Sequence, residues 1–180
     1  VANAAPVASV TGPSSGVRGQ SRTFTLTAVD SPDDTAAGFS FEIDWGDDTP
    51  LQQVNGPSGT EVSHVFAPFG TYDVVIKATD KDGVQSAAST AHPVSVKKHE
   101  LQGSVLAIGG PVAAADFLFD QVSGTLVNVI DQLDGGEVLT SFDPAAVSAV
   151  FVYGQDGDDR FTASNVWSTP LVMMGGGGTD

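Results

Sequence analysis

The chain has 180 residues, with 22 Asp and Glu against 7 Lys and Arg, a formal net charge of −15 and no Cys. So negative a chain disfavours nucleic acids and anionic lipids as partners, and without Cys it has no disulfide or thiolate metal site. No apolar run approaches the ~20 residues that a membrane-spanning helix needs. The chain starts without Met and stops just after the glycine run 175–178, so we expect it to be a piece of a longer protein.

The first hundred residues predict short strands, because apolar and polar side chains alternate along them. The clearest strands are the segments 22–29, 39–45 and 71–79. Further strands are expected near 6–10, 51–54, 60–66 and 86–97. Turns rich in Gly, Pro and Asp separate them. About seven strands with an apolar Trp on the third are typical of an immunoglobulin-like β-sandwich. We therefore predict an all-β chain with this sandwich over residues 1–98.

Four motifs follow one another within the predicted sandwich. They are Asp44-Trp45-Gly46-Asp47-Asp48, Val62-Ser63-His64-Val65-Phe66, Gly70-Thr71-Tyr72-Asp73-Val74 and Asp80-Lys81-Asp82-Gly83. In this order they resemble the PKD domain family over roughly residues 4–98, with Asp48 where the family usually has Gly. The resemblance implies a non-catalytic module of an extracellular or surface protein, which acts as a spacer or binds protein or polysaccharide. Trp45 is expected in the core, and His64 is expected to make a local hydrogen bond.

A calcium site is predicted at one end of the sandwich. The loop after the second strand and the loop after the sixth strand meet at the same end of this fold, close to the start of the first strand. Carboxylate and amide oxygens suit Ca²⁺, and some PKD domains bind Ca²⁺ in such a place. The expected ligands are Asn3, Asp30, Asp33, Asp80 and Asp82. The alternative is a set of solvated polar loops.

Residues 99–180 follow a different pattern, in which apolar segments alternate with corners rich in Gly and Asp. The corners 154–161 and 175–180 resemble the calcium-binding β-roll repeat G-G-x-G-x-D-x-U-x, in which U is apolar. We therefore expect a small β-roll or β-helix-like domain over 99–180. Its expected calcium ligands are Asp156, Asp158, Asp159 and Asp180. The alternative is that these corners are plain turns between strands.

No complete catalytic motif is present. His99 and Glu100 begin like a zinc-protease motif, but Gly103 stands where the second His would be. We expect a non-catalytic structural or adhesive module of a larger extracellular protein at a bacterial cell surface, stabilised by Ca²⁺ and joined to neighbouring modules of the same chain. Two alternatives stay open. One is an accessory module of a secreted hydrolase or protease that binds polysaccharide or protein, and the other is a subunit of a surface layer or filament.

Overall fold

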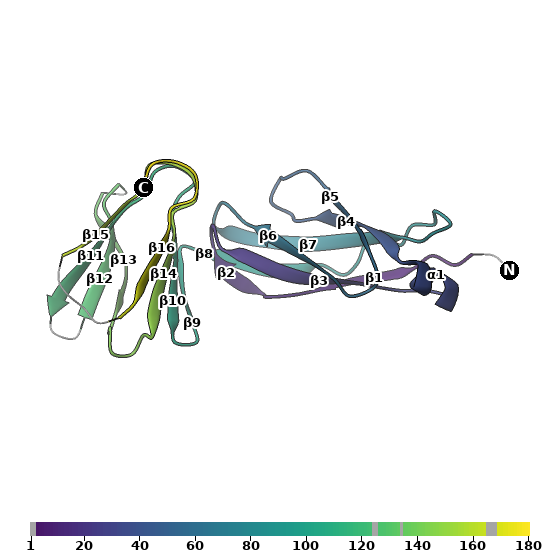
Figure 1. The fold of residues 1–180 in the computed structure, drawn as a ribbon, viewed down its shortest axis with the longest axis horizontal. Coiled ribbons are helices and arrows are strands. Elements are labelled where there is room, and N and C mark those ends of the chain that lie inside the picture. The colour runs from purple at the N-terminus through teal and green to yellow at the C-terminus, as the bar shows by residue number, and fades with distance from the viewer. Residues whose placement is uncertain (1–2, 124–125, 134, 165–168) are drawn as a thin grey trace. The chain divides into compact units, whose positions relative to one another are not determined.

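The computed structural model describes residues 3–123, 126–133, 135–164 and 169–180. It confirms the predicted all-β class, because strands make up most of the regular structure (Figure 1). The chain forms two compact units. The first contains residues 1–15, 21–64 and 71–95, and the second contains residues 16–20, 65–70 and 96–180. Among the described residues, no helix is long and apolar enough to cross a membrane.

The first hundred residues form two sheets. The three-stranded sheet has the order β1-β3-β6, with β1 at Val7–Thr11, β3 at Ser21–Val29 and β6 at Thr60–Val65. The five-stranded sheet has the order β2-β8-β7-β4-β5, with β2 at Ser15–Val17, β8 at His92–Lys97, β7 at Gly70–Thr79, β4 at Phe39–Asp44 and β5 at Gln52–Gly56. Strand β4 pairs antiparallel with both β5 and β7.

The strand expected over residues 86–97 is wrong in its first half, because strand β8 begins only at His92. The reason lies in two serines. The N–H groups of Ser86 and Ser89 donate to the carbonyls of Ala78 and Ile76, and the N–H groups of Ala78 and Ile76 donate to the two serine hydroxyls. The two serines thus supply hydrogen-bond partners for the backbone of β7. They are three residues apart in the sequence, whereas successive pairing residues of a regular strand are two apart.

The core of the sandwich is built from the alternating residues that the sequence singled out. Trp45 is 2% exposed, and its indole N–H donates to Gln52 Oε1 at 2.9 Å. The ring of His64 stacks on Trp45 with a centroid distance of 4.3 Å, while its Nε2 lies 2.7 Å from Asp47 Oδ2. The predicted roles of Trp45 in the core and of His64 in a local hydrogen bond are therefore confirmed.

The second unit contains two further four-stranded sheets. One has the order β16-β14-β10-β9, with β16 at Leu171–Met174, β14 at Ala149–Tyr153, β10 at Val105–Gly109 and β9 at His99–Gln102. The other has the order β13-β12-β11-β15, with β13 at Glu137–Phe142, β12 at Leu126–Asp131, β11 at Asp116–Ser123 and β15 at Arg160–Ala163. Their inner faces meet around Ile108, Phe117 and Val152.

Parallel pairing relates successive parts of this unit. Val105 in β10 is opposite Ala149 in β14, and Asp116 in β11 is opposite Arg160 in β15. Strand β16 then continues the first stack, with Val150 opposite Leu171. The antiparallel strands β12 and β13 belong to the segment of chain that connects the first layer of the stack to the second. The first layer of the stack is therefore separated from the second by more residues than the second is from the third.

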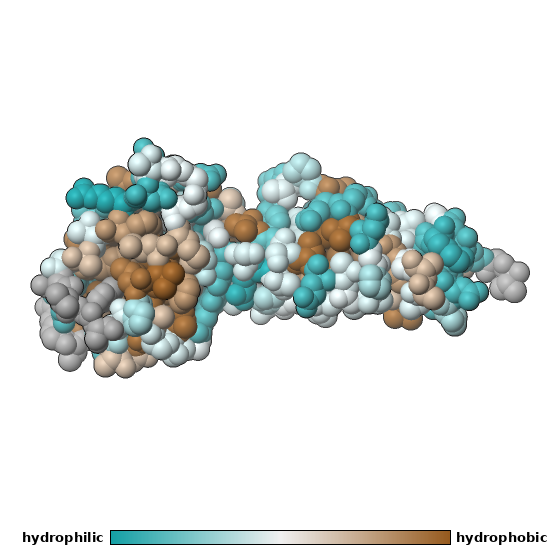
Figure 2. All heavy atoms as spheres, in the orientation of Figure 1, coloured by the Kyte–Doolittle hydropathy of each residue, from teal (hydrophilic) through white to brown (hydrophobic). Residues whose placement is uncertain are grey.

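Apolar side chains also remain on the outside of the second unit. Figure 2 shows hydrophobic residues gathered on its surface around strand β16, where Val172, Met173 and Met174 are among the exposed apolar residues. Strand β16 lies at the edge of its sheet.

Replacing Ile76, which is 1% exposed, tests the sandwich core. Ile76→Ala should lower the free energy of unfolding by about 2–5 kcal/mol, because it removes buried apolar atoms and leaves a cavity. Val29→Ala is the control. Val29 is 70% exposed, so its loss should change the stability by at most ~0.5 kcal/mol. Urea unfolding followed by circular dichroism measures both, and equal losses would contradict this core.

Candidate functional site

A short helix places the side chain of one aspartate, Asp34, on its buried side. Helix α1, Pro32–Ala37, follows directly after Asp30 and Ser31. The Ser31 hydroxyl accepts the N–H of Asp34 at 3.3 Å and donates to Asp34 Oδ2 at 2.6 Å. This exchange between the N-cap and the third helical residue is a capping arrangement, and Pro32 favours the first turn. It holds Asp34 on the buried side of the helix, where the residue is 2% exposed.

Three carboxylates meet at this end of the first unit, and we call Asp30, Asp34 and Asp80 the acidic cluster. One carboxylate oxygen from each lies within 4.8 Å of the other two. Asp80 follows strand β7 and is 6% exposed. The cluster therefore joins two loops that are about fifty residues apart in the sequence.

Hydrogen bonds hold the Asp80 carboxylate in place. Its Oδ1 accepts the N–H groups of Asp82 and Val84, both at 2.9 Å, and its Oδ2 accepts the amide of Asn3 at 2.7 Å. Burial acts to raise the pKa of Asp80, but these donors outweigh it and leave the pKa below its ordinary value. Asp80 is therefore ionised at neutral pH and cannot relieve the charge of the cluster by taking up a proton.

The other two carboxylates of the cluster differ in how their buried oxygens are compensated. Asp30 Oδ2 and Asp34 Oδ1 are both buried without a hydrogen-bond partner. The ammonium of Lys81 lies 3.0 Å from Asp34 Oδ1 as an ionic neighbour, and it also contacts the Asp82 carboxylate. The Ser31 hydroxyl and then Lys81 lower the pKa of Asp34. The buried Asp30 Oδ2 thus has no hydrogen-bond partner, whereas Asp34 Oδ1 has the ammonium of Lys81 beside it.

Only some of the residues expected at this site lie together in the structure. It brings Asn3, Asp30 and Asp80 together, whereas Asp33 is exposed on α1 and lies outside the acidic cluster. The side chain of Asp82 is 52% exposed and reaches Lys81. Asp34 was not expected. The pattern Ser-x-x-Asp at residues 31–34, a helix N-capping pattern, was the signal that could have identified it.

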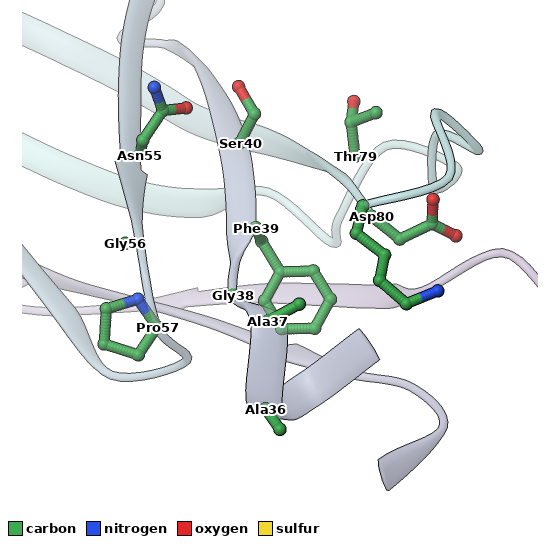
Figure 3. A pocket seen from close by; sticks show the side chains of 11 residues that line it. Ala36, Ala37, Gly38, Phe39, Ser40, Asn55, Gly56, Pro57, Thr79 and Asp80 are labelled. Carbon is green, nitrogen blue, oxygen red and sulfur yellow. The ribbon is translucent and has the colours of Figure 1, made fainter. Parts of the chain in front are cut away.

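A shallow pocket opens beside the acidic cluster (Figure 3). It has a volume of about 470 Å³, and Asp80, Thr79, Ser40 and Asn55 are among the residues that line it. Ser40 pairs across the sheet with both Asn55 and Thr79. Solvent therefore has a route to the cluster, although the carboxylates themselves are largely buried.

The second expected site lies in the corners of the second unit, where aspartates connect stacked layers. Asp159 Oδ1 accepts the N–H of Ala115 at 2.7 Å, and Asp180 Oδ1 accepts the N–H of Asp159 at 3.2 Å. The donor in each case belongs to the equivalent residue of the preceding layer, as the strand registers show. Asp158 bonds in the opposite direction and accepts the N–H of Thr179 at 2.9 Å.

Asp159 is buried, whereas the other three aspartates of these corners are exposed. The residue is 5% exposed, and its Oδ2 is buried without a hydrogen-bond partner. Burial raises the pKa of Asp159, the N–H of Ala115 opposes this, and the negative charges of Asp180, Asp158 and Asp156 raise it further. The four aspartates thus lie close enough to interact, and Asp159 Oδ2 has no hydrogen-bond partner among the described residues.

Glycine is required where these carboxylates pass over the backbone. A Cβ at Gly154 would overlap the carboxylate of Asp159, and a Cβ at Gly175 would overlap that of Asp180. The two corners therefore share the same packing of a glycine against the aspartate five residues later. Gln155 departs from the repeat and takes a φ of 72°, a conformation that glycine adopts more easily.

The comparison with known families decides the identity of the first unit. The PKD domain family matches residues 3–96, which is more than half of the chain. The chain belongs to the PKD domain family. PKD domains are non-catalytic extracellular modules of larger proteins, and the acidic cluster lies in this module.

Solved structures include further PKD domains. The PKD domain of an M14-like peptidase from Thermoplasmatales archaeon SCGC AB-540-F20 is 33% identical, and the match covers 54% of this chain and all (100%) of that one with a TM-score of 0.46. The PKD1 domain of Vibrio anguillarum Epp is 22% identical over 53% of this chain and 100% of that one, with a TM-score of 0.38. The fibronectin(III)-like modules of Clostridium thermocellum CbhA are 19% identical over 75% and 74% of the two chains, with a TM-score of 0.38.

The raised pKa of Asp159 predicts a pH dependence of stability in the presence of a chelator. A carboxyl whose pKa is higher in the folded state stabilises the fold below its unfolded pKa, and this contribution is lost as the pH rises through the folded pKa. Asp159→Asn is neutral at every pH and can still accept the Ala115 N–H. It should therefore melt about 2–4 °C higher than the original chain at pH 7, with no gain at pH 3.

Thermal melts from pH 3 to pH 7 measure this difference. The control is Asp143→Asn, because Asp143 is exposed in the same unit, and it should show no such gain. A variant that is less stable than the original chain at pH 7 in chelator would contradict the electrostatic strain at Asp159.

Proposed function

We propose that this PKD domain chain is a calcium-stabilised structural or adhesive module of a larger extracellular protein, and that it works alongside neighbouring modules of the same parent chain. The observation that carries the proposal is the acidic cluster, in which three carboxylate oxygens gather and the buried Asp30 Oδ2 lacks a hydrogen bond. A buried charge without a partner costs several kcal/mol, and a bound cation removes that cost. Family membership supports the structural role.

The dimensions of the acidic cluster suit calcium. Calcium binds oxygen at 2.3–2.6 Å, so two oxygens on one ion lie at most about 5 Å apart. The three carboxylate oxygens lie within 4.8 Å of one another. Asp30, Asp34 and Asp80 would hold the ion, and Asn3 already touches Asp80. Water entering through the pocket in Figure 3 would supply further oxygens.

A cation here would strengthen the module, because it would cross-link segments that are distant in the sequence. Asp30 and Asp34 flank the start of α1, whereas Asp80 ends strand β7. An ion that binds only the folded chain raises the free energy of unfolding by RT ln(1 + [L]/Kd). In millimolar extracellular calcium, a site with a Kd of ~10⁻⁴ M would thus contribute about 1.4 kcal/mol.

The corners of the second unit form a second calcium site in this proposal. The support is the unpaired buried Oδ2 of Asp159, together with the neighbouring charges that raise its pKa. Asp159 and Asp180 would hold the ion from successive layers, and Asp156 and Asp158 would add negative charge around it. The ion would turn a repulsion between layers into a link between them.

The first site is tested by calorimetric titration with calcium. Asp34→Asn should weaken the sandwich site by at least about tenfold, because it removes one of the three charged ligands. Asp33→Asn is a matched control, since Asp33 is the neighbouring helical residue but is exposed. It should leave the affinity unchanged. Equal effects of the two substitutions, or no saturable heat with any chain, would overturn the proposal for this site.

The second site is tested by amide hydrogen exchange in strands β14 and β16. Calcium should slow exchange there in the original chain, because a bound ion links the two layers, and Asp159→Asn should abolish this protection. Glu137→Gln serves as the control, because its side chain is 55% exposed in the same unit. Unchanged exchange on addition of calcium to the original chain would show that the corners are plain turns.

A further inference from the structure

The acidic cluster contains a positive charge of its own. Lys81 directly follows Asp80, and its ammonium lies 3.0 Å from Asp34 Oδ1. Asp34 Oδ1 is buried, and Asp34 is a member of the acidic cluster. The lysine therefore acts on a carboxylate that the proposed calcium ion would use.

Two cations would compete for this carboxylate. Lys81 offsets part of the negative charge of Asp30, Asp34 and Asp80, so it stabilises the cluster when no metal is bound. A divalent ion bound at the cluster would be repelled by an ammonium held so close to Asp34. Metal binding therefore requires the ammonium to leave Asp34. The loss of that ion pair makes the free energy of metal binding less favourable.

The surroundings allow Lys81 to leave. Its side chain is 41% exposed, and it lines the pocket beside the cluster. Its other partner, the carboxylate of Asp82, is more than half exposed and lies outside the cluster. Lys81 can thus keep one ionic partner while it moves away from Asp34 towards solvent.

We propose that Lys81 is a built-in counter-ion that occupies the cation position of the acidic cluster and sets the calcium concentration at which the metal replaces it. This inference rests on the proposed calcium site. Lys81 keeps the module folded in low calcium and holds the affinity in the weak range suited to extracellular calcium.

Calcium titration of Lys81→Met tests the inference, because Met keeps the apolar stem and removes the charge. The affinity should rise about tenfold, since one repulsive charge is lost next to a divalent ion. In chelator the variant should melt at a lower temperature than the original chain. Lys81→Arg retains the charge and should bind like the original chain. Lys77→Met controls for a general loss of charge, because Lys77 pairs with Glu42 at 3.6 Å.

The outcomes separate this inference from the calcium site itself. Binding by the original chain with equal or weaker binding by Lys81→Met would overturn the role of Lys81 and leave the calcium site standing. Binding by Lys81→Met alone would support the role of Lys81 and show that the original chain does not bind calcium at the concentrations used. An absence of binding by both chains would overturn both proposals. Lys81→Gln is the second variant, should Lys81→Met fail to fold in chelator.

Discussion

The burial of negative charge is the constraint on which both parts of this chain depend. Asp34, Asp80 and Asp159 are each more than 90% buried, in a chain with a net charge of −15. An isolated buried carboxylate costs several kcal/mol, so each of them needs donors, a counter-ion or a proton. The loops around these residues are best understood as three different ways of meeting that need.

The three carboxylates are compensated to different degrees. Asp80 receives two backbone N–H groups and an amide, and its pKa falls despite burial. Asp34 receives a hydroxyl and an ammonium. Asp159 receives one N–H and faces like charges, so its pKa rises. The surroundings therefore favour the charged forms of Asp34 and Asp80 and disfavour the charged form of Asp159.

Alternation of apolar residues was sufficient to predict the sandwich strands, because one buried face imposes a period of two. The site was harder to predict. Which of Asp33 and Asp34 points inward depends on a six-residue helix, which is too short to show a helical period. The partner of Asp159 is Ala115, and the hairpin β12–β13 lies between them, so no fixed repeat length connects the two residues. The contribution of Lys81 depends on a contact with Asp34, 47 residues earlier in the sequence, which topology alone does not reveal.

The two acidic sites would therefore respond differently to calcium. The cluster in the sandwich has Lys81 as an internal cation, which offsets part of its negative charge when no metal is bound. At the corner, burial and the neighbouring carboxylates raise the pKa of Asp159, and the N–H of Ala115 lowers it. An ion bound there removes a repulsion, whereas an ion in the sandwich replaces an attraction that already exists. For equal intrinsic contacts, the layers of the second unit would thus gain more stability from a bound calcium ion than the sandwich would.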